Sequence, residues 1–357
     1  MNCENYNARK AIERIEKMNL GHIRIMEVCG THTMAIAKSG LRGALPGNIE
    51  LLSGPGCPVC VTPPEVIDAV ISLAEQKNVT VATYGDMIKV PGSVPAKSLA
   101  TARAHGAEIS VVYSALDAVD IAERTPWREV VFLGVGFETT APGTAAAIKV
   151  AKERGVSNFS VFSLLKTVEP ALRALISQDG FNISGFLCPG HVATIIGARG
   201  FEFLARDYGL PCVVAGFEPR EILYATEKLL LQIEQNSPKI ENAYPDGATF
   251  EGNTLAAKMT EAVFEPTDAL WRGLGEIPAS GLSLREEFSE FDAVKKLGIT
   301  YEKNEKSSPC RCGDVICGKL SPRSCPLFGR ACTPENPVGP CMVSGEGACA
   351  AYYKYSE

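Results

Sequence analysis

The sequence has little that would carry the chain into a membrane or onto a polyanion. Its first residues, Met-Asn-Cys-Glu-Asn-Tyr, lack the basic stretch and the following apolar stretch of a secretory signal. No apolar run approaches the ~20 residues that a membrane-spanning helix needs. The net charge of −6 disfavours nucleic acid and anionic membranes as partners. We therefore expect a cytoplasmic protein with no nucleic-acid or membrane partner.

Cysteine, by contrast, is abundant. The 357 residues include 13 cysteines, and seven of these lie between Cys310 and the last residue. That tail is rich in Pro and Gly and poor in apolar residues. Something other than a core of its own must therefore order it, because fixing a backbone costs ~1–2 kcal/mol per residue. Disulfides, zinc or an iron–sulfur cluster could do so, and a reducing cytosol favours the metal or redox chemistry over disulfides.

Short β-rich runs alternate with amphipathic helical stretches through the first two thirds of the chain. Such alternation, with continuously apolar strands, predicts parallel sheets covered on both faces. We expect two Rossmann-like parallel-sheet α/β domains, formed by residues 1–125 and 126–220. Residues 221–357 are expected to form a helical segment, mostly helical over residues 240–300, and then a Cys-rich iron–sulfur domain. The predicted strands are residues 23–28, 49–53, 79–84, 109–114, 130–134, 159–164, 183–188 and 212–215.

Reactive side chains follow several of these strands at the point where each strand ends. Cys29 follows the first strand, Cys57 and Cys60 follow the second, and His191 follows the seventh. Loops at the carboxyl ends of parallel strands form the functional crevice of α/β folds. These loops therefore predict a site at that edge.

The Cys57-Pro-Val-Cys60 sequence stands just before a helix that is predicted to start near Pro64. The amino end of a helix lowers the pKa of a thiol and favours the thiolate. Two cysteines at this spacing can share one metal ion or form a disulfide. We interpret the pair as functional; the alternative is half of a zinc site, for which only Cys29 offers a further thiol among the neighbouring loops.

Cys29 is followed by Gly30, whose missing side chain permits close approach of a ligand or a partner backbone. His32 could orient or deprotonate the Cys29 thiol, and His191 could shuttle protons, bind metal or support a ligand. The alternatives are an inert buried thiol and a histidine satisfied by its own helix turn.

Two further carboxylates, Glu138 and Glu218, each end a Gly-Phe-Glu sequence after a predicted strand. Each is either a hydrogen-bond acceptor beside the site or a helix-capping carboxylate.

The C-terminal cysteines lack the paired C-x-x-C spacing that zinc prefers. Widely separated single cysteines suit a [4Fe–4S] cluster better, since each thiolate binds a separate iron. The predicted ligands are Cys312, Cys325, Cys332 and Cys349, which leaves Cys310, Cys317 and Cys341 as spare or packing residues. A zinc module stays open.

Several blocks occur in order from about residue 20 to the end. They are Cys29-Gly-Thr-His-Thr, Gly54-Pro-Gly-Cys-Pro-Val-Cys60, Gly85-Asp-Met-Ile-Lys-Val-Pro-Gly-Ser93, Gly136-Phe-Glu-Thr-Thr-Ala-Pro142, Pro189-Gly-His-Val192 and Gly347-Ala-Cys349-Ala-Ala-Tyr-Tyr. Together they resemble the HypD family of [NiFe]-hydrogenase maturation factors.

The resemblance implies a protein that assembles the Fe(CN)₂CO group of [NiFe] hydrogenases. It implies two partners, a HypC-type small chaperone that shares the iron and a HypE-type cyanide donor. Cys29 matches the cysteine that is thought to bind this iron together with the chaperone. Cys57 and Cys60 match a thiol pair implicated in redox exchange and in iron binding.

The resemblance also covers the C-terminal cysteines and the two histidines. Cys312, Cys325, Cys332 and Cys349 match the ligands of the family's [4Fe–4S] cluster, and His32 and His191 lie in matching blocks. Our hypothesis is a relay in which the cluster reduces the Cys57/Cys60 pair and the pair supplies electrons to iron at Cys29. The alternatives are an iron–sulfur-dependent thiol/disulfide oxidoreductase and a zinc-stabilised binding scaffold.

Overall fold

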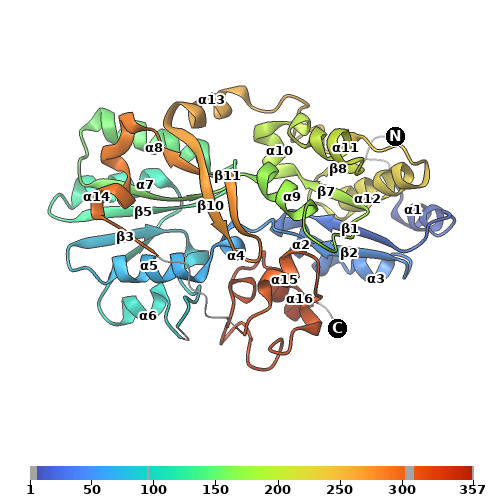
Figure 1. Ribbon diagram of the computed structural model, residues 1–357, viewed down its shortest axis with the longest axis horizontal. Coiled ribbons are helices and arrows are strands. Elements are labelled where there is room, and N and C mark those ends of the chain that lie inside the picture. The colour runs from blue at the N-terminus through green and yellow to red at the C-terminus, as the bar shows by residue number, and fades with distance from the viewer. Residues whose placement is uncertain (1–5, 95, 302–308, 356–357) are drawn as a thin grey trace.

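Two parallel β-sheets lie side by side, and the Cys-rich C-terminal segment packs beneath the junction between them (Figure 1). This computed structural model describes residues 6–94, 96–301 and 309–355. The α/β class with parallel sheets is therefore confirmed. No helix within the described residues is long and apolar enough to cross a bilayer.

The first sheet, sheet A, has the strand order β2-β1-β7-β8-β9, with every neighbouring pair parallel. Its strands are β1 (Ile23–Glu27), β2 (Ile49–Ser53), β7 (Gly185–Pro189), β8 (Cys212–Ala215) and β9 (Ile240–Asn242). Its helices are α1 (Ala8–Ile15), α2 (Gly30–Ser39), α3 (Leu41–Ala44), α10 (Gly190–Ile196), α11 (Glu202–Tyr208) and α12 (Pro219–Glu234), with the short 3₁₀ turn η3 (Ala198–Phe201).

The second sheet, sheet B, has the parallel order β4-β3-β5-β6. Its strands are β3 (Val79–Thr83), β4 (Glu108–Val111), β5 (Glu129–Gly136) and β6 (Phe159–Leu165). The helices around it are α4 (Pro58–Val61), α5 (Pro64–Ala74), α6 (Leu99–Ala104), α7 (Ala115–Arg124), α8 (Ala141–Arg154), α9 (Val168–Ile176), α13 (Thr254–Val263) and α14 (Ala293–Leu297), with the 3₁₀ turns η2 (Gly85–Met87) and η4 (Glu286–Phe291).

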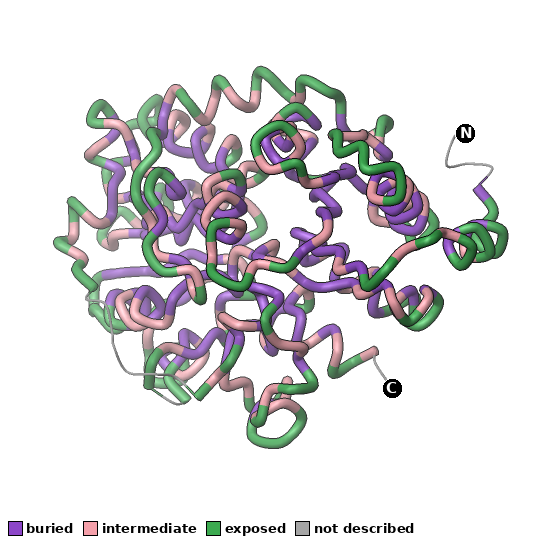
Figure 2. The backbone as a smooth tube through the Cα atoms, turned by 45° about the vertical axis from the view of Figure 1, so that its right-hand side comes forward, coloured by how far each residue is buried: buried purple, intermediate pink, exposed green. Residues whose placement is uncertain are grey.

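The strands form where the sequence is continuously apolar. Every residue of β3 and β7 is buried, as parallel strands covered on both faces require. Figure 2 shows this burial along the sheets, while the outer turns of the helices are exposed. The chain crosses from sheet A to sheet B after β2 and returns after β6. The predicted domain boundaries, at residues 125 and 220, do not coincide with these two crossings. They remain a prediction about which parts of the chain fold independently.

One predicted helical region is wrong. Within residues 240–300, β10 (Phe264–Trp271) and β11 (Gly275–Leu284) form an antiparallel hairpin. Gly273 and Gly275, at φ 80° and 76°, make the turn possible, because few other residues adopt positive φ. The tip of the hairpin reaches α4, where the Arg272 N–H donates to the Val61 carbonyl.

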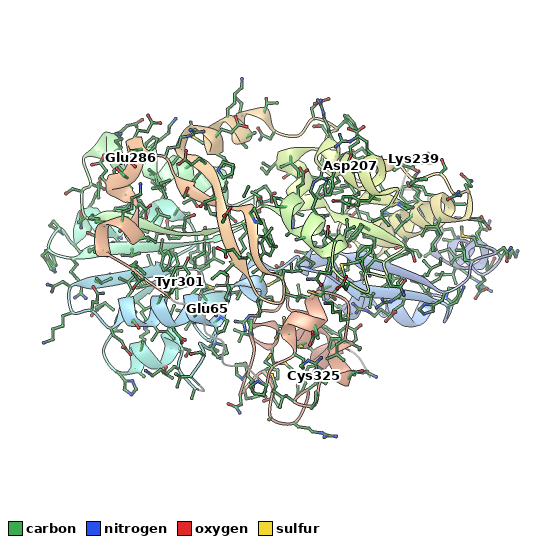
Figure 3. The ribbon with its side chains drawn as sticks, in the orientation of Figure 1. Glu65, Asp207, Lys239, Glu286, Tyr301 and Cys325 are labelled. Atoms are coloured by element: carbon green, nitrogen blue, oxygen red, sulfur yellow. The ribbon has the colours of Figure 1, made fainter. Side chains whose placement is uncertain are left out.

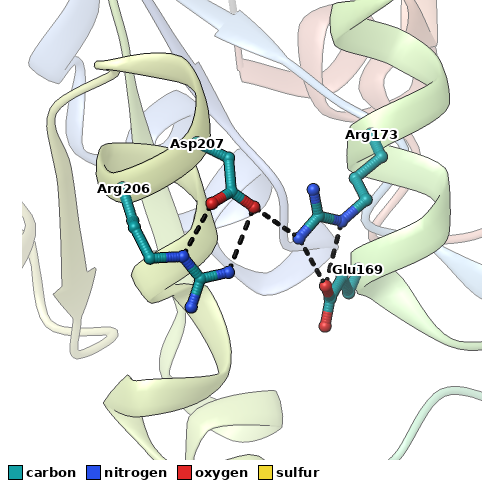
Figure 4. Close-up of polar contacts among 4 residues, drawn as sticks. All are labelled: Glu169, Arg173, Arg206 and Asp207. Atoms are coloured by element: carbon teal, nitrogen blue, oxygen red, sulfur yellow. Dashed lines mark hydrogen bonds and ion pairs between the residues drawn. The ribbon is translucent and has the colours of Figure 1, made fainter.

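Helix α9 connects the two sheets and is held to α11 by charge. Arg173 pairs with Glu169 on its own helix at 2.9 Å and with Asp207 on α11 at 2.9 Å (Figure 4). Arg206 pairs with the same aspartate at 2.6 Å. The two guanidinium groups, Arg206 first and then Arg173, lower the pKa of Asp207 to about 2.

The C-terminal segment has little regular structure. It contains α15 (Cys312–Ile316), η5 (Pro322–Ser324), η6 (Pro340–Met342) and α16 (Ala348–Tyr355). Its buried side chains do not form a core of their own. They join the largest apolar cluster of the protein, which also contains Cys57 and Cys60.

Candidate metal and thiol site

The two cysteine loops at the carboxyl edge of sheet A are in backbone contact. Cys29 caps the amino end of α2, and Cys57 caps the amino end of α4. The Gly30 N–H donates to the Gly56 carbonyl at 3.2 Å. A Cβ on Gly56 would lie 2.2 Å from the Cys29 nitrogen, so only glycine permits this approach. Adjacent parallel strands therefore bring the Cys29 loop against the loop of the Cys57/Cys60 pair.

The predicted lowering of the thiol pKa by a helix is wrong for Cys60. Helix α4 has four residues and little dipole, and Cys60 is buried. The neighbouring Cys341 thiol lowers the pKa of Cys60, but the hydrogen bond with Cys57 and the burial outweigh it and leave the pKa well above its ordinary value. Burial likewise raises the pKa of Cys29 to about 12. Both thiols are therefore protonated at neutral pH, and a metal that binds them must displace a proton.

A buried carboxylate at the end of β1 is hydrogen-bonded to the Cys29 loop. Glu27, the last residue of β1, accepts hydrogen bonds from the Cys29 N–H at 3.3 Å and from the Thr33 hydroxyl. Burial raises the pKa of Glu27 to about 7. Glu27 was not predicted as a site residue from the sequence, although a glutamate that ends an otherwise apolar strand is a detectable signal.

The two predicted histidines stack against one aromatic ring. Phe217, which follows β8, lies 5.0 Å from His32 and 3.9 Å from His191 between ring centroids. His32 is fully buried and donates from Nε2 to the Gly216 carbonyl at 2.9 Å, while its Nδ1 has no hydrogen-bond partner among the described residues. Burial lowers the pKa of His32 to about 4, so the ring is neutral. His191 is exposed at the start of α10, so its ring is the accessible one.

Both Gly-Phe-Glu carboxylates act as helix caps. Glu218 forms a capping box with Glu221 at the start of α12. Glu138 accepts from the Val168 N–H, at the start of α9, at 2.8 Å. The helix-capping alternative therefore describes both residues.

Five cysteines line one small apolar cavity in the C-terminal segment. They are Cys310, Cys312, Cys325, Cys332 and Cys349, which include all four predicted cluster ligands and one cysteine that the sequence analysis set aside. Figure 3 labels Cys325 within this segment, beneath the two sheets. Cys317 lies apart, with its sulfur 3.5 Å from the Gly273 carbonyl oxygen.

The surroundings of this cavity suit an iron–sulfur cluster. The Val338 N–H donates to the Cys332 sulfur at 3.3 Å, and backbone N–H groups that point at sulfur are typical of cluster sites. A Cβ on Gly339 would lie 2.3 Å from the Cys310 sulfur and 2.5 Å from the Cys312 sulfur. Among the described residues, no three His, Cys, Asp or Glu side chains surround a point where a single metal ion could bind. A cluster spreads its thiolates over several irons, and the donor set fits that arrangement.

Cys341, predicted to be a spare or packing residue, is buried in the core between the two groups of thiols. Its side chain is fully buried and lies next to the Cys60 thiol on one side and the Cys312 thiol on the other. Cys312 in turn contacts Cys310, at 3.0 Å between sulfurs, and Cys349. A continuous line of thiols thus runs from the Cys57/Cys60 pair to the cavity. None of the described cysteines forms a disulfide.

A separate cavity of about 570 Å³ is lined by α5 and by residues 297–301. It contains Glu65 and Tyr301 (Figure 3) but no cysteine, so it is not part of the line of thiols.

Comparisons with known proteins place the chain among related sequences. A family model named HypD and described as "Hydrogenase formation hypA family" matches residues 6–356. The hydrogenase maturation factor HypD of Rhodobacter capsulatus is 46% identical over 338 residues, which cover 93% of this chain and 89% of that protein. The HypD protein of Escherichia coli K12 is 44% identical over 336 residues, which cover 94% of this chain and 90% of that protein.

Proposed function

Because the chain belongs to the HypD family of hydrogenase maturation factors, we propose that it holds the iron on which the Fe(CN)₂CO group of a [NiFe] hydrogenase is assembled, and that it supplies electrons to that iron. A HypC-type chaperone shares the iron, a HypE-type protein delivers cyanide, and the work takes place in the cytoplasm. The observation that carries the proposal is the line of thiols that ends in backbone contact with the Cys29 loop.

Cys29 is the residue that we assign to the iron. Soft thiolates suit iron that carries strong-field ligands such as cyanide and CO. The exposed ring of His191 lies on the same edge of sheet A and can accept or donate a proton as ligands are attached. His32 stays neutral and orients the start of α2, since its Nε2–H is engaged with the Gly216 carbonyl.

The Cys57/Cys60 pair supplies the electrons. When both thiols become one disulfide, the pair releases two electrons and two protons, and the neighbouring iron centre takes the electrons. Cys341 lies between the pair and the cavity, so two electrons that reach the pair from that side, together with two protons, would return the Cys57–Cys60 disulfide to two thiols. Contacts from Cys60 to Cys341 and from Cys341 to Cys312 support this route.

The cysteine cavity would hold a [4Fe–4S] cluster. The four predicted ligands, Cys312, Cys325, Cys332 and Cys349, would bind the irons, and Cys310 lines the same cavity. A cluster bound there would supply single electrons for the reduction of the Cys57–Cys60 disulfide. The backbone N–H at Val338 and the open side of Gly339 accommodate the thiolates.

Infrared spectroscopy of the anaerobic complex with the HypC-type chaperone tests the proposal. We expect bands of bound cyanide and CO in the wild-type complex and their loss in a Cys29→Ala variant. Cys317→Ser, which changes a thiol outside the line, is the matched control and should keep the bands. A Cys29→Ala complex with wild-type bands would disprove the iron site, and normal loading in Cys57→Ala would disprove the relay.

The second candidate function is an iron–sulfur-dependent thiol/disulfide oxidoreductase, favoured by the contact between Cys60 and Cys341. Catalytic reduction of a small disulfide by the isolated protein would support that function. A colourless protein after anaerobic purification would instead indicate zinc, since an iron–sulfur protein is brown.

A further inference from the structure

The segment of residues 341–349 contacts three parts of the thiol site. Cys341, at one end, touches Cys60, and Cys349, at the other end, lines the cysteine cavity. Between them the Ser344 hydroxyl donates to Asp86, in the loop after β3, at 3.3 Å. Glu346 reaches the start of α2. One short stretch of chain therefore connects the cavity, the dithiol and the Cys29 loop.

The contact between Glu346 and α2 is close and specific. The Thr31 hydroxyl donates to Glu346 Oε1 at 2.6 Å. A Cβ on Gly30 would lie 2.5 Å from the Glu346 Cβ and 2.9 Å from its carbonyl oxygen. Gly30 was expected to admit a ligand or a partner; the structure fills that space with the backbone of the chain's own C-terminal segment. The first turn of α2, with Cys29 at its cap, is thus shaped to receive Glu346.

The charge of Glu346 acts on the buried thiol of Cys29 and on the exposed imidazole of His191. Its carboxylate raises the pKa of Cys29, although less than burial does, and it opposes the lowering by burial of the pKa of His191. No described Lys or Arg side chain forms an ion pair with it. Its negative charge is therefore directed at the thiol and the imidazole.

We propose that Glu346 is a positioning residue for the iron. Through Thr31 and Gly30 it fixes the loop that presents Cys29, and it does so from the segment whose ends are Cys341 and Cys349. The geometry of Cys29 therefore depends on the ordering of the cysteine cavity. This inference rests on the proposed function, in which Cys29 holds the iron.

The test is infrared spectroscopy of the anaerobic chaperone complex with three variants. Glu346→Ala should weaken the cyanide and CO bands by about tenfold, because a hydrogen bond to a charged group is among the stronger ones. Glu346→Gln keeps an acceptor for Thr31 but loses the charge, so its bands should keep their intensity and shift in frequency. Glu335→Gln, an exposed position of the C-terminal region outside residues 341–349, is the control and should match the wild type.

Two outcomes would overturn the inference. The first is a Glu346→Ala complex with bands of wild-type intensity and frequency. The second concerns the case in which Glu346→Ala also loses the visible absorbance of the cluster and so fails to fold. The Thr31→Val variant, which leaves the C-terminal segment intact, must then weaken the cyanide and CO bands. Unchanged bands in Thr31→Val would refute the positioning role of Glu346. Failure of the proposed function looks different, since bands would then be absent in the wild type or retained in Cys29→Ala.

Discussion

Replacing Glu138 with glutamine should make the protein more stable at high pH. The Oε2 atom of Glu138 is buried without a hydrogen-bond partner among the described residues, while Oε1 accepts from the Val168 N–H. Burial raises the pKa of this carboxyl from 4.5 to about 7. The folded protein therefore keeps the proton in a range of pH where the unfolded chain has lost it.

The sign of the effect follows from that difference. Between pH 4.5 and about 7 the folded state binds more protons than the unfolded state, so stability falls as the pH rises through this window and stays lower above it. Since one pKa unit corresponds to about 1.4 kcal/mol, the full cost above pH 7 is at most about 3 kcal/mol. A glutamine carries no charge and can still accept from Val168. We expect Glu138→Gln to be about 1–3 kcal/mol more stable than the wild type at pH 8 and nearly equal to it at pH 4.5.

The assay is anaerobic urea unfolding at pH 4.5 and pH 8, followed by tryptophan fluorescence, because Trp271 stacks on Phe137 beside the substituted residue. Glu153→Gln, an exposed position on α8, is the matched control and should change nothing. Equal free energies of unfolding for Glu138→Gln and the wild type at pH 8 would refute the reasoning, since the carboxyl would then be ionised in the fold at no cost.

Three further predictions concern other parts of the molecule. Gly339→Ala should lose the iron and the visible absorbance of the cluster, because its Cβ would lie 2.3 Å from the Cys310 sulfur, whereas Gly345→Ala, with nothing within 4 Å, should keep both. Phe217→Leu should raise the pKa of His191, measured by NMR titration, because the ring contributes to the burial that lowers it; an unchanged pKa would contradict this. Asp207→Asn should remove a stabilisation that the wild type has above pH 4 and loses as the pH falls toward 2. The midpoints of thermal unfolding of the two proteins should therefore converge at pH 2. A difference between the midpoints that stays constant with pH would argue against the depressed pKa of Asp207.

The strands could be predicted from the sequence because parallel strands are continuous apolar runs. The run that begins at Ile23 and the run that begins at Ile49 both became neighbouring strands of sheet A. Their order in the sheets could not be predicted, since β7 pairs with β1 although all four strands of sheet B lie between them in the sequence. The hairpin of β10 and β11 was missed because many of its residues are exposed, so that no apolar period distinguishes it from a helix.

For the site, too, the local features could be predicted from the sequence and the long-range contacts could not. The spacing of Cys57 and Cys60 and the glycines around them are local signals, which a sequence displays directly. The contacts of Cys341 with Cys60, and of Glu346 with Thr31 across 315 positions, exist only once the C-terminal segment has packed against sheet A. Neither Cys341 nor Glu346 has a local pattern that distinguishes it from a packing or surface residue.

The shared core of the C-terminal segment and the sheets has a consequence for the order of assembly. A group that binds the folded cysteine cavity, and not the unfolded chain, stabilises every residue that packs with it. The dithiol belongs to that same core. Under the proposed function, a newly made chain that had not yet received an iron–sulfur centre would have a loosened dithiol and would be a poor carrier, so that iron would be loaded only onto copies already equipped to reduce it.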